Sequence, residues 1–152
     1  MAEHKITLLN GAVKLDLPDD PGLKPTTDAV FLASVCLARA GDRLLDLGCG
    51  VGTVALCVSA RVPGVRITGV DCDAVLVECA HRNAAMNGVA DATFLVGDVR
   101  VCPDRVAQPV FDHVVMNPPF YQGGTFVPPE DARRARALGH FGPEVSSPRR
   151  RG

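Results

Sequence analysis

Apolar residues in this chain gather in short runs that are separated by longer segments of mixed character. Four runs of five or six residues have the length and composition of buried strands, and they lie at 43–47, 66–70, 92–96 and 111–116. Two segments between them, 53–62 and 73–87, have the length of helices, and Gly88 ends the second. Short strands that alternate with helices of about 10–15 residues predict an α/β protein with a doubly wound, mostly parallel sheet.

The N-terminal part has a different pattern. Two short apolar stretches flank an Asn-Gly dipeptide, which suits the positive φ angles of a tight turn, so residues 6–17 are predicted to form a β-hairpin. A loop rich in proline, glycine and aspartate follows. A helix is then predicted over residues 28–40, after a Thr-Thr-Asp capping segment and with Gly41 as its stop. This helix is apolar on most faces, so we expect it to be largely covered.

The composition is that of an ordinary globular domain. The 152 residues are 47% hydrophobic and 22% charged, which excludes the disordered and fibrous classes for most of the chain. The N-terminus has no stretch of signal-peptide type and nowhere do about 18 apolar residues run together, so a cytoplasmic protein is predicted. The six cysteines include no C-x-x-C pair, and no pair of the four histidines has metal-ligand spacing. We therefore expect free thiols and no metal site.

The charge is unevenly distributed along the chain. The net charge is −1, but residues 130–152 hold six arginines against three acidic residues, so this segment is +3 and the rest is −4. A basic segment of this kind suits contact with a nucleic-acid backbone. A solvated tail is the alternative.

The first predicted strand ends in the sequence DLGCGVGT, residues 46–53. Ligands of an open parallel sheet bind at the carboxyl ends of its strands, so this segment is a candidate site. Gly48 and Gly50 allow a tight turn and the close approach of a ligand, and the next helix presents free N–H groups. The spacing G-x-G-x-G differs from the G-x-G-x-x-G of dinucleotide sites, and Asp46 at the mouth of this turn suits a ligand with an ammonium group.

Two further aspartates stand at the ends of the next predicted strands. Asp71 follows the glycine segment by about 20 residues, the separation at which an acidic side chain meets ribose hydroxyl groups on such sheets. Asp98 is placed at the same edge, where a carboxylate could accept a hydrogen bond from the amino group of an adenine. A helix cap for Asp71 and a plain Gly-Asp turn for Asp98 are the alternatives, and Asp73 is expected to cap the following helix.

The fourth predicted strand leads into N-P-P-F, residues 117–120, where the prolines end the strand and hold the chain in one direction. Together with D-x-G-x-G-x-G and the acidic second strand end, N-P-P-F resembles the S-adenosylmethionine-dependent methyltransferases of planar amino nitrogens, over residues 26 to about 137. The resemblance implies a Rossmann-like class I methyltransferase fold and S-adenosylmethionine as the cofactor. It also implies that Asn117 and the Pro118 carbonyl accept both hydrogens of a substrate NH₂ group, while Phe120 stacks on its plane.

Two segments narrow the resemblance to the bacterial tRNA-Val adenine-N6 methyltransferases. Residues 25–33 (PTTDAVFLA) resemble the G-T-D-A-x-L-L-A segment of these enzymes, and residues 129–140 resemble the arginine-rich segment after their N-P-P-[YF]. By this resemblance Thr27 and Asp28 border the methionine end of the cofactor, with a helix cap as the alternative. The implied activity is methylation of adenine N6, with tRNA as the partner.

The resemblance has a limit at the C-terminus. Such methyltransferases have three strands after N-P-P-[YF], whereas 32 residues follow Phe120 here and residues 139–152 contain no run fit for a strand, which indicates truncation. The predicted division is a hairpin and loop over 1–24, a partial S-adenosylmethionine-binding domain over 25–138 and a basic irregular tail over 139–152. A release-factor glutamine methyltransferase and a non-catalytic S-adenosylmethionine-binding module are the alternatives. The unpaired sheet edge would also favour self-association.

Overall fold

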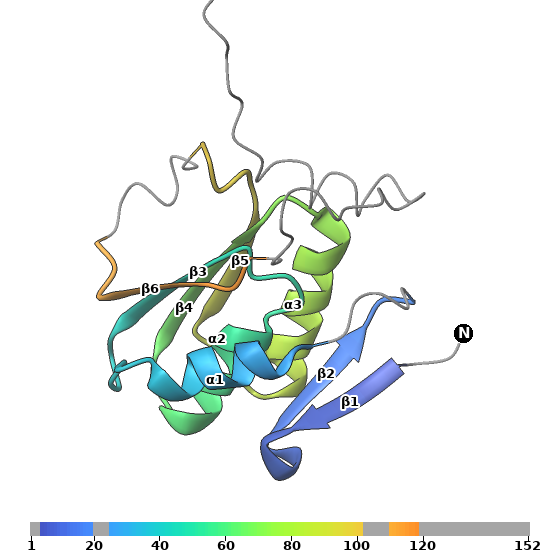
Figure 1. Ribbon diagram of the computed structural model, residues 1–152, viewed down its shortest axis with the longest axis horizontal. Helices are drawn as coiled ribbons and strands as arrows, with labels where there is room; N and C mark the ends of the chain where they lie inside the picture. The colour runs from blue at the N-terminus through green and yellow to red at the C-terminus, as the bar shows by residue number, and fades with distance from the viewer. Residues whose placement is uncertain (1–3, 20–24, 102–109, 119–152) are drawn as a thin grey trace, which may run out of the picture. The chain divides into compact units, whose positions relative to one another are not determined.

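A computed structural model describes residues 4–19, 25–101 and 110–118 (Figure 1). Its centre is a four-stranded parallel sheet in the spatial order β5-β4-β3-β6, made of β3 (Arg43–Leu47), β4 (Arg66–Asp71), β5 (Ala92–Val96) and β6 (His113–Met116). Helix α2 (Thr53–Arg61) joins β3 to β4, and α3 (Ala74–Met86) joins β4 to β5. The predicted α/β fold with a mostly parallel sheet is thus confirmed. Phe120, the arginine-rich segment and the basic tail lie outside the described residues.

The strand register brings the strand ends to one edge of the sheet. Leu47, the last residue of β3, pairs with Val70 of β4 on one side and with Met116 of β6 on the other. Asp71, the last residue of β4, pairs with Val96 of β5. All four strands run in the same direction, so the segments that follow them meet at this carboxyl edge.

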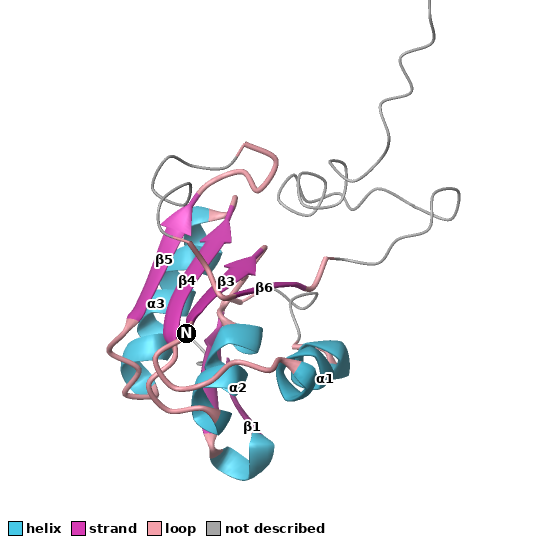
Figure 2. Cartoon of the chain, turned by 90° about the vertical axis from the view of Figure 1, so that its left-hand side faces the viewer, coloured by secondary structure: helices cyan, strands magenta, loops and turns pink. Residues whose placement is uncertain are grey.

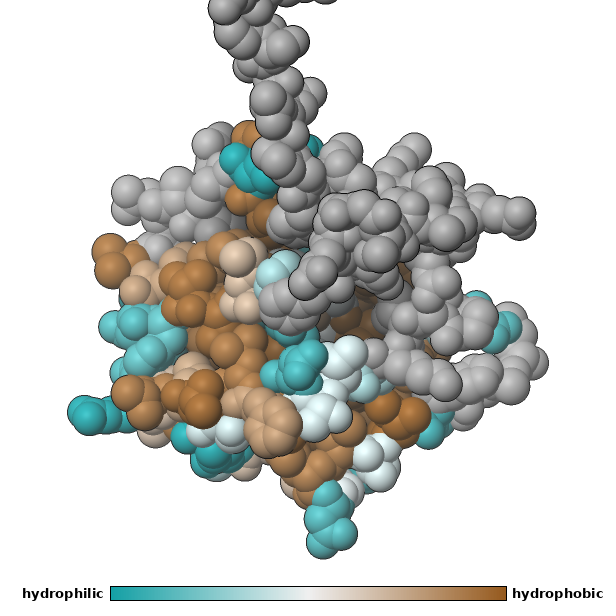
Figure 3. Space-filling view, viewed as in Figure 1, coloured by the Kyte–Doolittle hydropathy of each residue, from teal (hydrophilic) through white to brown (hydrophobic). Residues whose placement is uncertain are grey.

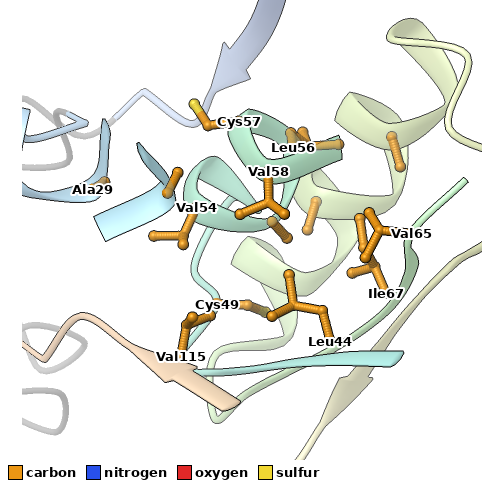
Figure 4. Close-up of a cluster of buried hydrophobic side chains, with 14 of the residues drawn as sticks. Ala29, Leu44, Cys49, Val54, Leu56, Cys57, Val58, Val65, Ile67 and Val115 are labelled. Atoms are coloured by element: carbon orange, nitrogen blue, oxygen red, sulfur yellow. The ribbon is translucent and has the colours of Figure 1, made fainter. Parts of the chain in front are cut away.

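The two faces of the sheet belong to different clusters of side chains. One face supplies side chains to the main core together with helices α1 (Thr27–Val35), α2 and α3 (Figure 4). The buried residues that the parallel sheet contributes to this cluster are Leu44, Ile67, Phe94 and Val115. Leu45 and Val70 alternate with these residues and form a second cluster on the opposite face. Helix α3 packs against β5 and β4 (Figure 2). The core-facing helices therefore support the strands that carry the carboxyl edge.

The predicted hairpin is present at the N-terminus. Strands β1 (His4–Leu8) and β2 (Val13–Leu17) pair in antiparallel fashion. They are joined by the 3-10 turn η1 (Leu9–Gly11), in which Leu9, Asn10 and Gly11 all have positive φ. Val13 and Leu15 of β2 are buried in the main core, which anchors the hairpin to the α/β domain.

Helix α1 differs from its prediction in length and in exposure. It ends at Val35 rather than at residue 40, because Cys36 is extended and its carbonyl accepts a hydrogen bond from the Arg61 guanidinium instead of continuing the helix. The expectation of a covered helix was wrong, because its buried residues are the small Ala29 and Ala33, whereas Phe31 and Val35 are 65% and 67% exposed. Apolar surface extends over α1 and β6 in Figure 3. No helix in the described ranges is long and apolar enough to cross a membrane.

Candidate functional site

The glycine segment after β3 turns back onto the end of β4. The amides of Gly48 and Cys49 both donate to the carbonyl of Val70, at 2.8 and 3.0 Å, and the Gly50 amide donates to Asp71 Oδ2 at 2.8 Å. Gly48 and Gly50 have φ angles of 71° and 53°, which residues with a Cβ atom rarely adopt. The predicted glycine turn is therefore present, and it lies against the acidic end of the second sheet strand.

Asp71 connects the glycine turn to helix α3. Its Oδ2 accepts the Gly50 amide, and its Oδ1 accepts the Asp73 amide at 2.9 Å. The Asp73 side chain in turn accepts the Val75 amide at 2.8 Å, which confirms that Asp73 caps α3. A carboxylate has about four acceptor positions. Asp71 can therefore also accept hydrogen bonds from a ligand at the strand edge.

Asp46 lies beneath the glycine turn rather than at its mouth. It is only 1% exposed, because the strand alternation places it on the core face of β3 with Leu44, where the backbone of Ala55 in α2 donates a hydrogen bond to it. Within the described ranges its Oδ2 has no hydrogen-bond partner. Burial raises the pKa of Asp46 to about 7; the Ala55 hydrogen bond opposes this rise and the charge of Asp71 adds to it. A buried acceptor without a partner is costly, so this oxygen fits a donor that a ligand would bring.

The floor of the site is packed closely around Gly69. This residue pairs with Asp46 of β3 on one side and with Phe94 of β5 on the other. A Cβ atom at Gly69 would come within 2.4 Å of the Phe94 ring and within 2.9 Å of the Cys49 sulfur. Gly69 is therefore required for steric reasons. A glycine inside a predicted strand does not reveal this role, because the ring that fills the space comes from another strand.

The cysteines of the described residues are free thiols. Four of them are buried and one is exposed, and they are Cys36, Cys49, Cys57, Cys79 and the exposed Cys72. Burial raises the pKa of the thiol of Cys49, which is part of the glycine turn, so this group stays protonated. Over the same ranges, no group of three or more histidine, cysteine, aspartate or glutamate side chains could hold a metal ion.

Two of the predicted substrate-binding residues follow β6 directly. Asn117 and Pro118 are both half-buried at the carboxyl edge. Because Met116 pairs with Leu47, Asn117 stands level with Gly48, the first residue of the glycine turn. The structure therefore brings the start of N-P-P-F to the edge that carries the glycine turn and Asp71.

The other predicted site residues have different surroundings. Asp98 follows β5 and is bound to Arg100, whose guanidinium group contacts both carboxylate oxygens. Thr27 and Asp28 are exposed in the first turn of α1, and no hydrogen bond among the described residues joins them to the strand ends. Phe120 lies outside the described residues. The roles of these four residues stay predictions.

Asn83 of α3 contacts the glycine turn, and the hydrophobic pattern does not reveal this contact. It is fully buried, and its Nδ2 donates to the carbonyl of Val51, in the middle of the glycine turn, at 3.0 Å. A single asparagine in a helix has no periodic signal, because helices tolerate it on any solvated face. Its spacing of four residues from Asn87 is the signal that could have found it.

Together, the strand ends form an edge rich in hydrogen-bond acceptors. Asp71 and the glycine turn lie at its centre, with the buried Asp46 beneath the turn. Asn117 and Pro118, which carry a side-chain amide oxygen and a backbone carbonyl, follow the neighbouring strand β6. Such an edge suits a ligand with amino and hydroxyl groups beside a planar amine.

Three comparisons with known proteins show what this chain is similar to. A tRNA1(Val) (adenine(37)-N6)-methyltransferase of Porphyromonas gingivalis is 33% identical over 117 residues, which are 72% of this chain and 46% of that protein. A release factor glutamine methyltransferase of Thermodesulfovibrio yellowstonii is 32% identical over 84 residues, which are 55% of this chain and 29% of that protein. This chain thus spans about half the length of the first of these relatives.

A solved structure and a family match complete the comparison. The tRNA (uracil-54, C5)-methyltransferase of Pyrococcus abyssi, solved in complex with S-adenosyl-L-homocysteine, superposes with a TM-score of 0.59 at 28% identity and covers 78% of this chain and 29% of that one. The methyltransferase small domain family matches residues 26–129, a range that holds the glycine turn, Asp71, Asp98 and Asn117. The chain therefore belongs to the methyltransferase small domain family.

Proposed function

We propose that this chain binds S-adenosylmethionine and is part of an N-methyltransferase that acts on adenine N6 in tRNA. The observation that carries the proposal is the buried Oδ2 of Asp46, which has no hydrogen-bond partner among the described residues and lies beneath a glycine turn that Asp71 holds in place. An acceptor of this kind fits the ammonium group at the methionine end of the cofactor. The likeness to a tRNA adenine-N6 methyltransferase and to a tRNA methyltransferase solved with the demethylated cofactor supports it.

The residues at the strand ends would each bind a different part of the cofactor. Asp46, with Thr27 and Asp28 of α1, would hold the methionine end, and Asp71 would accept from the ribose hydroxyl groups. Asp98 would accept a hydrogen bond from the adenine amino group. This requires that its ion pair with Arg100 opens, or that one lone pair of a carboxylate oxygen stays available. When bound, the cofactor supplies an electrophilic methyl group on a sulfonium centre.

The substrate amine would be held by the segment after β6. The Asn117 side-chain oxygen and the Pro118 carbonyl would each accept one N–H of the amino group, and Phe120 would stack on the base. An aryl amine is a poor nucleophile because its lone pair is delocalised into the ring. Two fixed acceptors favour a more tetrahedral nitrogen whose lone pair is free to react, and the proline holds one acceptor without backbone freedom.

The proposal extends to partners and to the rest of the protein. The proposed substrate is tRNA, and its phosphates would contact the arginines that follow residue 130. Because the proposed substrate is tRNA, the proposed location is the cytoplasm. Among the described strands β6 pairs only with β3, and it exposes Val114 and Met116 by 58% and 49%. We expect this edge to self-associate, or to be completed by further strands in a longer protein.

A second candidate function follows from the likeness to a release factor glutamine methyltransferase. A side-chain amide is planar and carries an NH₂ group like that of adenine, so the same pair of acceptors could bind it. A non-catalytic S-adenosylmethionine-binding module is the third candidate, because this chain spans only part of its relatives.

Two measurements separate these functions. Calorimetric titration should show binding of S-adenosylmethionine and not of NAD; affinity for NAD alone would overturn the cofactor assignment. Transfer of a labelled methyl group is then followed on unmodified bulk tRNA and on release factor, with Asn117→Ala as the matched control. Label on tRNA supports the main proposal and label on release factor supports the second. The cofactor could bind without any transfer of the methyl group to tRNA or to release factor. If this also holds for a chain extended by further strands of the family, the non-catalytic binding module is supported.

A further inference from the structure

Helix α3 carries two asparagines that take the place of a neighbouring strand for β2. Asn83 Oδ1 accepts the Asp16 amide at 2.7 Å, and its Nδ2 donates to the Asp16 carbonyl at 3.2 Å. Asn87 Oδ1 accepts the Lys14 amide at 2.8 Å, and its Nδ2 donates to the Lys14 carbonyl at 2.6 Å. Each side-chain amide therefore satisfies both backbone groups of one β2 residue, as a paired strand would.

The spacing of the two elements explains why this pairing works. Residues four apart in a helix are separated by about 6 Å along its axis, and residues two apart in a strand by roughly 6.6 Å. Asn83 and Asn87 therefore match Asp16 and Lys14, respectively, in spacing, with the helix and the strand running in opposite directions. The opposite edge of β2 is paired with β1. The amide orientations follow from the same contacts, because a backbone N–H needs an oxygen and a carbonyl needs an N–H.

Only one of the two asparagines also reaches the glycine turn. Asn83 Nδ2 donates to the carbonyl of Val51 at 3.0 Å, whereas Asn87 Nδ2 makes its further bond to the carbonyl of Asn83 within the same helix. The Val51 carbonyl would otherwise suit the Ala55 amide four residues later, but that amide is directed to Asp46. Val51 is buried, so its carbonyl depends on Asn83.

We propose that Asn83 is a positioning residue that sets the cofactor turn and couples it to the N-terminal hairpin. The turn is held on one side by Asp71 at the Gly50 amide and on the other by Asn83 at the Val51 carbonyl. These two bonds fix the backbone of Gly50 and Val51, and with it the direction of the backbone groups of the turn that would face the cofactor. The inference rests on the proposed cofactor, but its structural part concerns the turn in the free protein.

The test compares Asn83→Asp with Asn87→Asp in the full chain. Each substitution keeps an acceptor for β2 and removes the donors, but only the first releases the Val51 carbonyl. In the free protein, the amide NMR signals of Gly50 and Gly52 should shift in Asn83→Asp and stay in place in Asn87→Asp. Below the melting temperature of both variants, the Kd for S-adenosylmethionine should rise about tenfold, or 1.4 kcal/mol, in Asn83→Asp relative to Asn87→Asp.

A measurement on the unmodified protein covers the case in which Asn83→Asp does not fold. Once calorimetry has shown that the cofactor binds, saturating S-adenosylmethionine should slow hydrogen exchange at the Asp16 amide several-fold, because coupling between two sites is reciprocal. Equal Kd values and unmoved glycine signals in the two variants, or unchanged exchange at Asp16 in the unmodified protein, would overturn the role of Asn83. Failure of the unmodified protein to bind the cofactor would instead refute the proposed function, while the glycine signals would still test the turn.

Discussion

Raising the pH from 5 to 8 should destabilise the folded protein through the carboxyl group of Asp46. Its pKa is about 7 in the folded state against an ordinary value of 3.8, so between about pH 4 and 7 the folded state keeps a proton that the unfolded state has lost. The free energy of unfolding therefore falls as the pH rises through this window, by up to 1.36 kcal/mol per unit; the loss is roughly 4 kcal/mol over the whole window, of which about 3 kcal/mol falls between pH 5 and 8. A loss of this size is a large fraction of the ~5–15 kcal/mol of a typical domain.

Urea unfolding at several pH values, for the protein and for Asp46→Asn, measures this effect. The unmodified protein should lose stability up to about pH 7 and then level off, and Asp46→Asn should lack this slope. Asp42→Asn is the control, because hydrogen bonds from the Arg39 backbone and from His113 lower the pKa of Asp42, so that it stays ionised between pH 5 and 8. A slope that persists in Asp46→Asn, or an unmodified protein that is more stable at pH 8 than at pH 5, would contradict the role of Asp46.

The same carboxyl group should make cofactor binding dependent on pH. The proposed ammonium ligand favours the ionised form of Asp46, so binding below pH 7 requires the loss of a proton. The Kd for S-adenosylmethionine should therefore fall by up to tenfold for each unit that the pH rises toward 7, and it should then become constant. In Asp46→Asn binding should be weaker and independent of pH over this range. A flat Kd in the unmodified protein would contradict the contact with the ammonium group.

Three further changes test other parts of the structure. Asn117→Ala should lower turnover about 10²–10³-fold in an active form with little change in cofactor affinity, and equal turnover would refute the two-acceptor clamp. Gly69→Ala should cost about 1–3 kcal/mol in urea unfolding, because its Cβ would lie 2.4 Å from the Phe94 ring, and Phe94→Leu in the same chain should recover part of this loss. Extending the chain by the strands that follow N-P-P-F in the family should raise methyl transfer and reduce self-association on size exclusion; a fully active monomer of the short chain would show that these strands are dispensable.

The order of strands and helices could be predicted because each element carries its own signal. Residues 43–47 and 92–96 are too short for helices and lie between turn residues, and both are strands in the structure. The end of α1 could not be predicted in this way, since Cys36 and Leu37 are compatible with a helix. It is a tertiary hydrogen bond, from Arg61 to the Cys36 carbonyl, that takes the chain out of the helix there.

The residues at the strand ends could be predicted from the sequence, but the burial of Asp46 could not. Glycines with positive φ and an acidic residue at the next strand end are local signals, and the structure joins them through the bond between Gly50 and Asp71. The burial of Asp46 depends on which sheet face the helices cover, and the apolar run RLLDL gives no clear alternation by which to choose that face. The change from an exposed to a buried carboxyl group matters, because it makes the residue sensitive to pH near neutrality.

The hydrogen bonds that connect the hairpin to the glycine turn cannot be predicted from the sequence of any one helix or strand. Asn83 and Asn87 together pair one edge of β2, because the helical step of four residues matches the strand step of two. The substitution of either residue by alanine would improve helix propensity and leave the hydrophobic pattern unchanged. What would be lost is the pairing of one edge of β2 and, for Asn83, the support of the Val51 carbonyl. The hairpin, which lies outside the matched methyltransferase segment of residues 26–129, is thereby connected to the turn that we propose binds the cofactor.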